Sequence, residues 1–213
     1  MAAVMQAPTQ SLPLGMDNGA SEADWAAALI HARCTVLPKR LVAPGPDPVQ
    51  LDAILGAAAA APDHGELVPW RFVLVPDRAR PALAGVFGQS LLERDPAASA
   101  DQCAQAREKA FRAPVLLLAI ADLGGSPEIL AAERLVSAGC ALQNMLLMAT
   151  AQGFGSALTS GKALQSQGLR RLFSLRPDEQ PLCFLSLGTA GARRPRRARP
   201  PLAHYVSELE VSA

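Results

Sequence analysis

The sequence predicts a single α+β domain. Three runs rich in aliphatic, β-branched and aromatic residues have the composition of buried strands, at residues 70–75, 115–121 and 182–189. Segments with helical patterns lie between them. A doubly wound parallel sheet would show a similar alternation, but no Gly-x-Gly-x-x-Gly follows any of these strands, and the sequence has no P-loop. We therefore expect helices packed on a sheet that lacks a dinucleotide-binding fingerprint.

The predicted helices are marked by signals at their ends. Ser21 is followed three residues later by Asp24, which is the pattern of a capping box, and Asp47 is related to Gln50 in the same way. Gly153 marks the C-terminal end of the longest helix. Together with the apolar patterns, these signals predict helices over residues 22–33, 48–61, 77–92, 99–112, 127–152 and 162–173, and a short strand over 153–159.

Composition and charge restrict the class of protein. Half of the 213 residues are hydrophobic and only 18% are charged, an apolar balance that hints at surface buried between subunits. The net charge of +1 gives no electrostatic case for a nucleic-acid partner or a membrane surface. The longest apolar run, residues 114–121, is far shorter than the roughly 20 residues that span a bilayer. Neither a membrane nor a nucleic-acid partner is therefore expected.

The cysteines and the N-terminal segment indicate a cytoplasmic protein. The four cysteines are scattered without a Cys-x-x-Cys pair, and no histidine has metal-ligand spacing, so neither a disulfide framework nor a metal site is expected. Residues 1–20 lack the features of a signal peptide, and their Pro, Gln, Ser and Gly content predicts a disordered tail. Residues 21–213 are expected to form one domain, because no internal repeat or linker divides them.

The most informative stretch is residues 61–73, Ala-Pro-Asp-His-Gly-Glu-Leu-Val-Pro-Trp-Arg-Phe-Val. Pro62 ends the preceding helix because proline clashes with the turn before it, and Trp70 starts a buried strand. Asp63 and His64 therefore follow a helix end, where polar side chains and free backbone groups can meet a ligand. Taken alone, His64 is more simply interpreted as a solvated or capping histidine, and Asp63 as a residue that caps or orders the turn.

This stretch resembles the nitroreductase family, the FMN-dependent NAD(P)H oxidoreductases. The similarity is greatest to a short bacterial branch that carries Ala-Pro-Asp-His followed by Pro-Trp-Arg-Phe. Further segments match in the same order between about residues 25 and 205, and this ordered combination is quite specific. The matching segments are residues 29–34, 133–141, 151–155, 160–161 and 184–189.

The resemblance implies a nitroreductase-like fold, in which helices flank a central, mainly antiparallel sheet. It also implies a homodimer whose subunits exchange C-terminal arms and hold FMN at their interface. Residues 21–213 would then form one FMN-binding domain. The implied enzyme passes electrons from NAD(P)H to a nitroaromatic, a quinone or a related small acceptor by a ping-pong mechanism. The flavin carries this chemistry, so no catalytic side chain is expected.

The resemblance further assigns residues to the cofactor. In the family, the segment at residues 32–34 contacts the FMN phosphate and ribityl chain, and Arg33 retains a guanidinium whose forked donors suit a phosphate. The position of His64 contacts the flavin, and the start of the arginine run at residues 193–199 lies close to a basic phosphate contact. The expected cofactor-binding residues are Ala32, Arg33, Cys34, Ala60, His64, Gln152, Gly153, Leu158, Thr159, Ser160, Arg193 and Arg194.

Several of these positions depart from the family pattern. Ala32, Ala60 and Thr159 each stand where close relatives often have arginine, so three basic contacts are lost. One alternative is therefore a degenerate member of the fold that binds flavin or another ligand without turnover. A second alternative is nucleic-acid binding through the arginine run, although aromatic residues that could stack on bases are not interleaved with it. Gln152 and Gly153 correspond to an NAD(P)-contacting stretch, but a glycine-capped helix end also explains them.

Overall fold

The computed structural model of the protein describes residues 21–125, 127–191 and 198–211. Its strands are β1 (Leu41–Val42), β2 (Trp70–Leu74), β3 (Val115–Asp122), β4 (Gly155–Thr159) and β5 (Glu179–Ala190). Its α-helices are α1 (Glu22–Ala32), α2 (Pro48–Gly56), α3 (Arg80–Arg94), α4 (Ala100–Glu108), α5 (Ala131–Ala151) and α6 (Gln167–Leu172). Short 3-10 helices connect them, namely η1 (Pro38–Arg40), η2 (Ala57–Ala60), η3 (His64–Glu66), η4 (Asp77–Ala79), η5 (Lys109–Phe111), η6 (Lys162–Gln165) and η7 (Leu202–His204).

The strands form one sheet in the order β1-β5-β3-β2, and β4 also pairs with β5. Each of these strand pairs is antiparallel. The predicted antiparallel α+β fold is therefore confirmed, and a doubly wound parallel sheet is excluded. The two-residue strand β1 was not part of the sequence prediction, because two residues carry no detectable periodicity.

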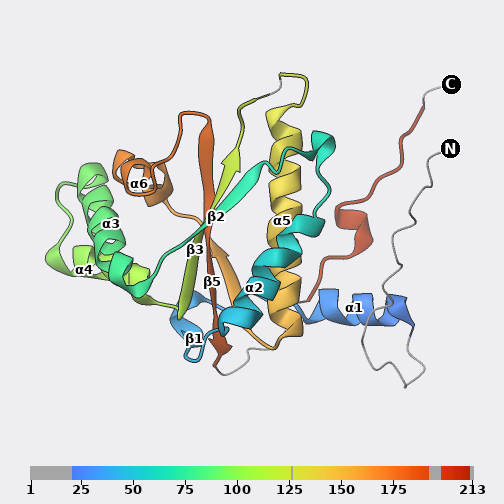
Figure 1. Ribbon diagram of the computed structural model, residues 1–213, viewed down its shortest axis with the longest axis horizontal. Helices are drawn as coiled ribbons and strands as arrows, with labels where there is room; N and C mark the ends of the chain where they lie inside the picture. Colours follow the sequence, from blue (N-terminus) through green and yellow to red (C-terminus); the bar gives the residue numbers. More distant parts are fainter. Residues whose placement is uncertain (1–20, 126, 192–197, 212–213) are drawn as a thin grey trace, which may run out of the picture.

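Each face of the sheet has its own hydrophobic core, because neighbouring residues of β3 point to opposite sides. Leu117 packs with Ile54 of α2 and Met145 of α5. Leu116 and Leu118 pack instead against residues of α3 and α6. Figure 1 shows the resulting layers, with α2 and α5 on one face of the sheet and α3, α4 and α6 on the other.

The second helix, α2, begins where the sequence predicts but ends before the predicted residue 61. Asp47 accepts a hydrogen bond from the Gln50 N–H at 2.8 Å, and Gln50 accepts one in return from the Asp47 N–H at 3.0 Å. The α-helix ends at Gly56, and the following alanines tighten into the 3-10 turn η2. Ala58 in this turn is buried against α5, where a larger side chain would hold the two helices apart.

The longest helix, α5, starts later than the residue 127 that the sequence predicts. It begins at Ala131, and the Glu133 side chain accepts a hydrogen bond from the Leu130 N–H at 3.2 Å. This bond satisfies one of the backbone donors that a helix start leaves without a partner, and so fixes the boundary. Gly153 follows the C-terminal end at φ +84°, which confirms its predicted capping role.

The helix predicted over residues 162–173 is divided in two. Its first part is the 3-10 helix η6 and its second part is α6. Ser166 lies between them in an extended conformation, and its Oγ accepts a hydrogen bond from the Leu169 N–H at 3.1 Å. Serine competes with the helical backbone in this way, so it starts a new helix instead of continuing the old one.

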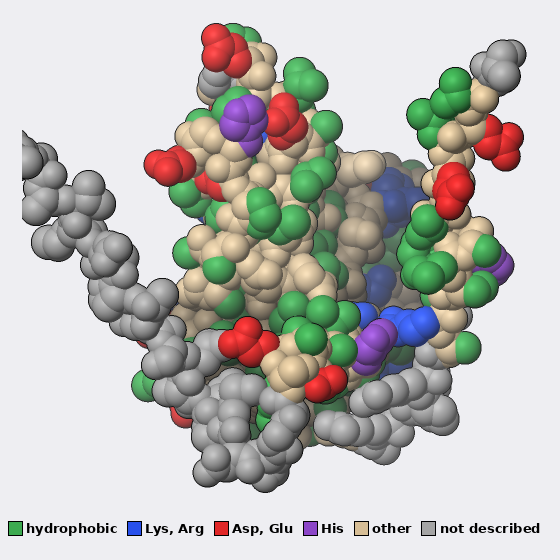
Figure 2. All heavy atoms as spheres, turned by 90° about the vertical axis from the view of Figure 1, so that its right-hand side faces the viewer, with side chains coloured by type: hydrophobic (Ala, Val, Ile, Leu, Met, Phe, Trp, Pro, Cys, Tyr) green, Lys and Arg blue, Asp and Glu red, His purple; other side chains and the backbone are tan. Residues whose placement is uncertain are grey.

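Helix α1 and the C-terminal segment lie outside these layers (Figure 1). No residue of α1 is buried, and Trp25 and Ile30 are 49% and 51% exposed. Residues 198–211 also expose apolar side chains, including Leu202 and Tyr205. Figure 2 shows this segment as an arm separated from the main body by a hollow. Apolar surface gathered in this way is typical of a surface that binds another protein.

Candidate functional site

The turn between η2 and β2 has an unusual backbone. Gly65, Glu66 and Val68 have φ values of +77°, +52° and +46°. Positive φ is uncommon for a residue other than glycine and is a genuine outlier for a β-branched residue such as Val68. Asp63 holds the conformation, because its Oδ2 accepts a hydrogen bond from the Val68 N–H at 2.6 Å. Backbone strain that is held in place by side chains often marks a functional site.

His64 in this turn binds a carboxylate on α5. Its Nδ1 lies 2.8 Å from Oε2 of Glu133, while Oε1 of the same carboxylate accepts the Leu130 N–H at 3.2 Å. The hydrogen bond with His64, followed by the bond with the Leu130 backbone, lowers the pKa of Glu133 from its usual value. Glu133 is thus an ionised group that joins the turn to the start of α5.

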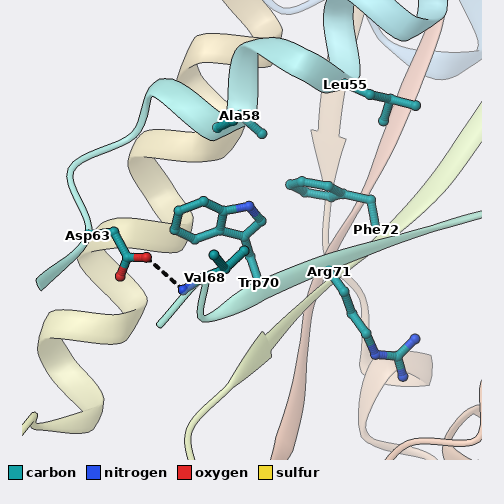
Figure 3. A pocket seen from close by; sticks show the side chains of 8 residues that line it. Leu55, Ala58, Asp63, Val68, Trp70, Arg71 and Phe72 are labelled. Carbon is teal, nitrogen blue, oxygen red and sulfur yellow. Dashed lines mark hydrogen bonds between the residues drawn. The ribbon is translucent and has the colours of Figure 1, made fainter. Parts of the chain in front are cut away.

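A cavity of about 310 Å³ opens beside the turn. It is lined by Leu55, Ala58, Ala59, Asp63, Val68, Trp70, Arg71 and Phe72. Figure 3 shows the Trp70 and Phe72 side chains on the side of β2 that faces α2, whereas Arg71 points the opposite way. The Oδ1 atom of Asp63 is buried and has no hydrogen-bond partner among the described residues. The cavity therefore combines apolar walls with one carboxylate oxygen that is free to accept a donor.

Arg71 is not available to bind an anion in this cavity. Its guanidinium is paired with Glu179, with Nε 2.6 Å from Oε1 and Nη2 2.9 Å from Oε2. The Glu179 carboxylate also accepts the Arg176 N–H at 2.8 Å. The hydrogen bonds from Arg71 lower the pKa of Glu179 to about 2 and the hydrogen bond with Glu179 raises that of Arg71, so both groups remain charged.

A second group of predicted residues lies at the C-terminal end of α1. Arg33 caps this helix and is half-buried, with Ala32 before it and the exposed thiol of Cys34 after it. Arg199, from the C-terminal segment, donates a hydrogen bond from Nη2 to the Arg33 carbonyl oxygen at 3.2 Å. Two arginines that are far apart in the sequence are therefore close in space. Figure 2 shows Lys and Arg side chains in the hollow between the main body and the C-terminal arm.

The chain after α1 is attached to β4. The Val36 N–H donates to the Ser156 carbonyl oxygen at 2.9 Å, and Thr35 forms a parallel bridge with Ser156. Gln152 lies just before β4, and its Oε1 is buried without a hydrogen-bond partner among the described residues; the same holds for Oγ of Ser156. This junction therefore holds polar atoms with unused hydrogen-bonding capacity.

The predicted cofactor residues fall into separate groups. His64 lies at the N-terminal end of α5, where it is bonded to Glu133, and Ala60 ends η2, which packs against α5. Helix α1, which Arg33 caps, lies at the C-terminal end of α5 (Figure 1). A helix of 21 residues is about 30 Å long. Leu158, Thr159 and Ser160 form a further group at the far end of β4 from the Ser156 junction, and Gln152 and Gly153 lie between α5 and β4. Arg193 and Arg194 lie outside the described residues.

The sequence predicted neither the pairing of Glu133 with His64 nor that of Arg199 with Arg33. Glu133 is 69 positions from His64, so no local spacing relates the two side chains. Glu133 begins a segment that resembles the family, and its place near the start of an apolar helix indicates helix capping, but neither signal points to His64. Arg199 belongs to an arginine run that is equally typical of a solvated loop. Only the path of the chain brings each residue to its partner.

Two kinds of feature are absent from the part of the chain that the structure describes. None of its helices has both the length and the apolar character needed to cross a membrane. It also contains no cluster of three or more His, Cys, Asp or Glu side chains arranged to bind a metal ion.

Comparisons with known proteins identify relatives of this chain. The model of the nitroreductase family matches residues 41–189. The Escherichia coli protein YdjA, provisionally named an NAD(P)H nitroreductase, is 36% identical over 152 residues, which cover 70% of this chain and 81% of YdjA.

Solved structures show the same fold. A nitroreductase-like family protein from Bacillus cereus superposes with a TM-score of 0.75 at 19% identity, over 86% of this chain and 95% of that one. A protein from sphigopyxis sp. strain HMH, described as an FMN- and NADPH-dependent nitroreductase, superposes with a TM-score of 0.67 at 18% identity, over 85% and 97% of the two chains. The family match spans the strained turn, α5 and the whole sheet from β1 to Thr189 of β5. This chain belongs to the nitroreductase family.

Proposed function

We propose that the protein is an FMN-dependent oxidoreductase that passes electrons from NAD(P)H to a small acceptor such as a nitroaromatic or a quinone. The observation that carries this proposal is the family match over residues 41–189, which includes the turn, α5 and β4. The names of YdjA and of the sphigopyxis protein support NAD(P)H and FMN as the reactants. Bound flavin would supply the hydride chemistry, and one open face would serve donor and acceptor in turn, as a ping-pong mechanism requires.

The end of α1 fits the phosphate of such a cofactor. Arg33 is half-buried, and Arg199 is hydrogen-bonded to its carbonyl oxygen, so two guanidinium groups belong to one small region. A guanidinium binds phosphate oxygens through paired N–H donors, and a second positive charge strengthens the attraction. We assign Arg33 and Arg199 to the phosphate. Arg193 and Arg194 stay predictions for the same role.

The other predicted residues are suited to the flavin ring and the ribityl chain. Small side chains such as Ala32 and Ala60 leave room for a flat ring or a sugar chain. Gln152 has a buried Oε1 without a described partner, which can accept a hydrogen bond from a ribityl hydroxyl or from a second subunit. Ser160 is exposed and can contribute a hydroxyl group. In this assignment the protein binds and orients the cofactor, and no nucleophile is required.

We further propose that the site is completed by a second copy of the chain. The His64 and Arg33 groups lie at opposite ends of a helix that is about 30 Å long, which exceeds the reach of one FMN molecule. Exposed apolar residues on α1 and on the C-terminal arm provide a surface for the other subunit. Exchange of the two arms would place Arg199 and its neighbours in an interface. Free cysteines throughout the protein agree with a cytoplasmic location.

The first test is the visible spectrum of the purified full-length protein, before and after addition of FMN and desalting. We expect about one retained flavin per subunit, bleached by NAD(P)H under anaerobic conditions and reoxidised by a nitroaromatic compound. Arg33→Ala should weaken FMN binding about 10- to 100-fold, because it removes charge-assisted hydrogen bonds. The matched control is Arg78→Ala, which removes an exposed arginine at η4 on the other side of the molecule and should leave binding unchanged.

The altered residues favour a second candidate, a protein that binds flavin without turnover. Ala32, Ala60 and Thr159 supply no positive charge where close relatives often have arginine. Flavin that is retained but not reduced by NADH or NADPH would support this candidate. Protein that retains no FMN would contradict both the oxidoreductase and the flavin-storage proposals.

A further inference from the structure

The turn that carries His64 is held from three sides. Asp63 accepts the Val68 N–H at 2.6 Å within the turn. A Cβ atom placed on Gly65 would lie 2.6 Å from Cδ1 of Ile129, so the backbone there is packed against the segment that precedes α5. His64 itself is bonded to Glu133 at 2.8 Å. Figure 1 shows η3 beside the N-terminal end of α5, which is the rigid element to which the turn is attached.

The His64–Glu133 pair fixes the positions of both side chains while leaving one edge of the imidazole open. The two side chains are 68% and 42% exposed, and no described residue is hydrogen-bonded to Nε2 of His64. A carboxylate only accepts hydrogen bonds, so Glu133 requires a proton on Nδ1. In the neutral ring, the lone pair is then on Nε2, which faces away from Glu133.

We propose that Glu133 is a positioning residue that sets the tautomer of His64, so that Nε2 presents a hydrogen-bond acceptor to a ligand bound at the turn. Glu133 performs this role with Oε2, while its Oε1 holds the start of α5 through Leu130. The ligand group that Nε2 recognises is an N–H or O–H donor. If the proposed FMN site is correct, this group belongs to the flavin or to the acceptor next to it, and this part of the inference rests on the proposed function.

Other charged groups lie near the pair along the chain. Asp63 and Glu66 lie in the same turn as His64, and Glu128 and Arg134 flank Glu133 along the chain. Arg134 lowers the pKa of Glu133, in the same direction as the hydrogen bond with His64 does. The hydrogen bonds from His64 and from the Leu130 N–H, together with the charge of Arg134, favour the ionised form of Glu133, which can only accept hydrogen bonds.

The direct test is the tautomer of His64 in the full-length protein, measured by long-range ¹H–¹⁵N NMR at about pH 8.5, where an ordinary imidazole is neutral. The chain has three histidines, so loss of one signal in His64→Ala assigns the resonance. We expect the proton on Nδ1 in the natural protein. In Glu133→Asp the carboxylate is withdrawn by one carbon–carbon bond, about 1.5 Å, and we expect the proton to redistribute towards Nε2.

The control is Glu93→Asp, the same shortening on the remote helix α3, which should leave the His64 signal unchanged. A proton on Nε2 in the natural protein would overturn the inference, as would an unchanged tautomer in Glu133→Asp. This measurement needs no bound FMN. It therefore decides the role of Glu133 even if the chain binds no flavin.

FMN titrations of four proteins then test whether Glu133 acts through His64. We expect Glu133→Asp to weaken FMN binding about three- to tenfold, which corresponds to the loss of one hydrogen bond. In the His64→Ala background, the same change should not weaken FMN binding further, because the imidazole that Glu133 positions is absent. A residue that only caps α5 would instead weaken binding equally in both backgrounds. Failure of all four proteins to bind FMN would contradict the proposed function and leave the tautomer result standing.

Discussion

The guanidinium of Arg71 on β2 and the carboxylate of Glu179 on β5 are joined by two hydrogen bonds of 2.6 and 2.9 Å. Strand β3 lies between these two strands and pairs with both, so the ion pair reaches across it. The side chain of Glu179 is only 1% exposed, whereas that of Arg71 is 37% exposed. The two residues therefore form a half-buried ion pair that links β2 to β5. It lies at the end of the sheet where β2 begins, directly after the strained turn.

We expect Arg71→Met to destabilise the protein by about 2 kcal/mol. Loss of one partner from a buried ion pair typically costs about 3–5 kcal/mol, and the partial exposure of Arg71 and the remaining contacts of Glu179 with Arg176 reduce this cost. Urea unfolding at fixed protein concentration measures the change. Arg78→Met, at an exposed site, should change stability by less than about 0.5 kcal/mol. Equal unfolding free energies of the two variants would show that the Arg71–Glu179 ion pair contributes little to stability.

The Arg71–Glu179 ion pair also predicts that the stability of the protein depends on pH. The pKa of Glu179 is lowered from 4.5 to about 2 in the folded protein, chiefly by the hydrogen bonds from Arg71. The resulting stabilisation is fully present above about pH 4.5 and is lost as the pH falls towards 2, because the unfolded chain then binds the proton more readily. The difference in unfolding free energy between the natural protein and Arg71→Met should therefore narrow over this range. A difference that stays constant from pH 6 down to about pH 2 would contradict this account.

Gly65→Ala should damage the candidate site more than the fold. Its φ of +77° is unfavourable for alanine, and the new Cβ would lie 2.6 Å from the Ile129 side chain. We expect a loss of about 1–2 kcal/mol in thermal or urea unfolding, together with weaker FMN binding. Gly56→Ala is the matched control, because Gly56 has helical angles and open space around it. That change should be neutral or stabilising by up to about 1 kcal/mol.

The exposed face of α1 predicts the oligomeric state. Trp25 and Ile30 are about half exposed, and we expect Trp25→Asp with Ile30→Asp to convert a dimer into a monomer and to abolish tight FMN binding. Size-exclusion chromatography with light scattering measures the mass. Phe111→Asp introduces an aspartate in place of another exposed apolar residue, 53% exposed on η5 next to α4, and should not dissociate the dimer. A natural protein that is already monomeric, or a double variant that still dimerises, would refute the proposed interface.

Local features of the sequence predicted most of the elements of this fold. The capping pairs at Ser21 and Asp47 fix the starts of α1 and α2, and Gly153 ends α5, because caps depend on side chains within a few residues. Apolar β-branched runs predicted β2, β3 and β5 for a similar reason. The start of α5 was predicted too early and the break at Ser166 was not predicted, since neither boundary is marked by a proline or a glycine.

The sequence by itself therefore determined the class of fold, the family and the candidate residues, because motifs and periodicity are properties of the chain over short distances. Only the tertiary structure decided which side chains meet. Glu133 reaches His64, and Arg199 reaches Arg33, across 69 and 166 positions. Contacts over such separations depend on how the helices pack on the sheet, and no local pattern encodes that packing. The separation of His64 from Arg33 along α5 is likewise a property of the folded chain, and it is the reason why one copy does not bring the two groups together.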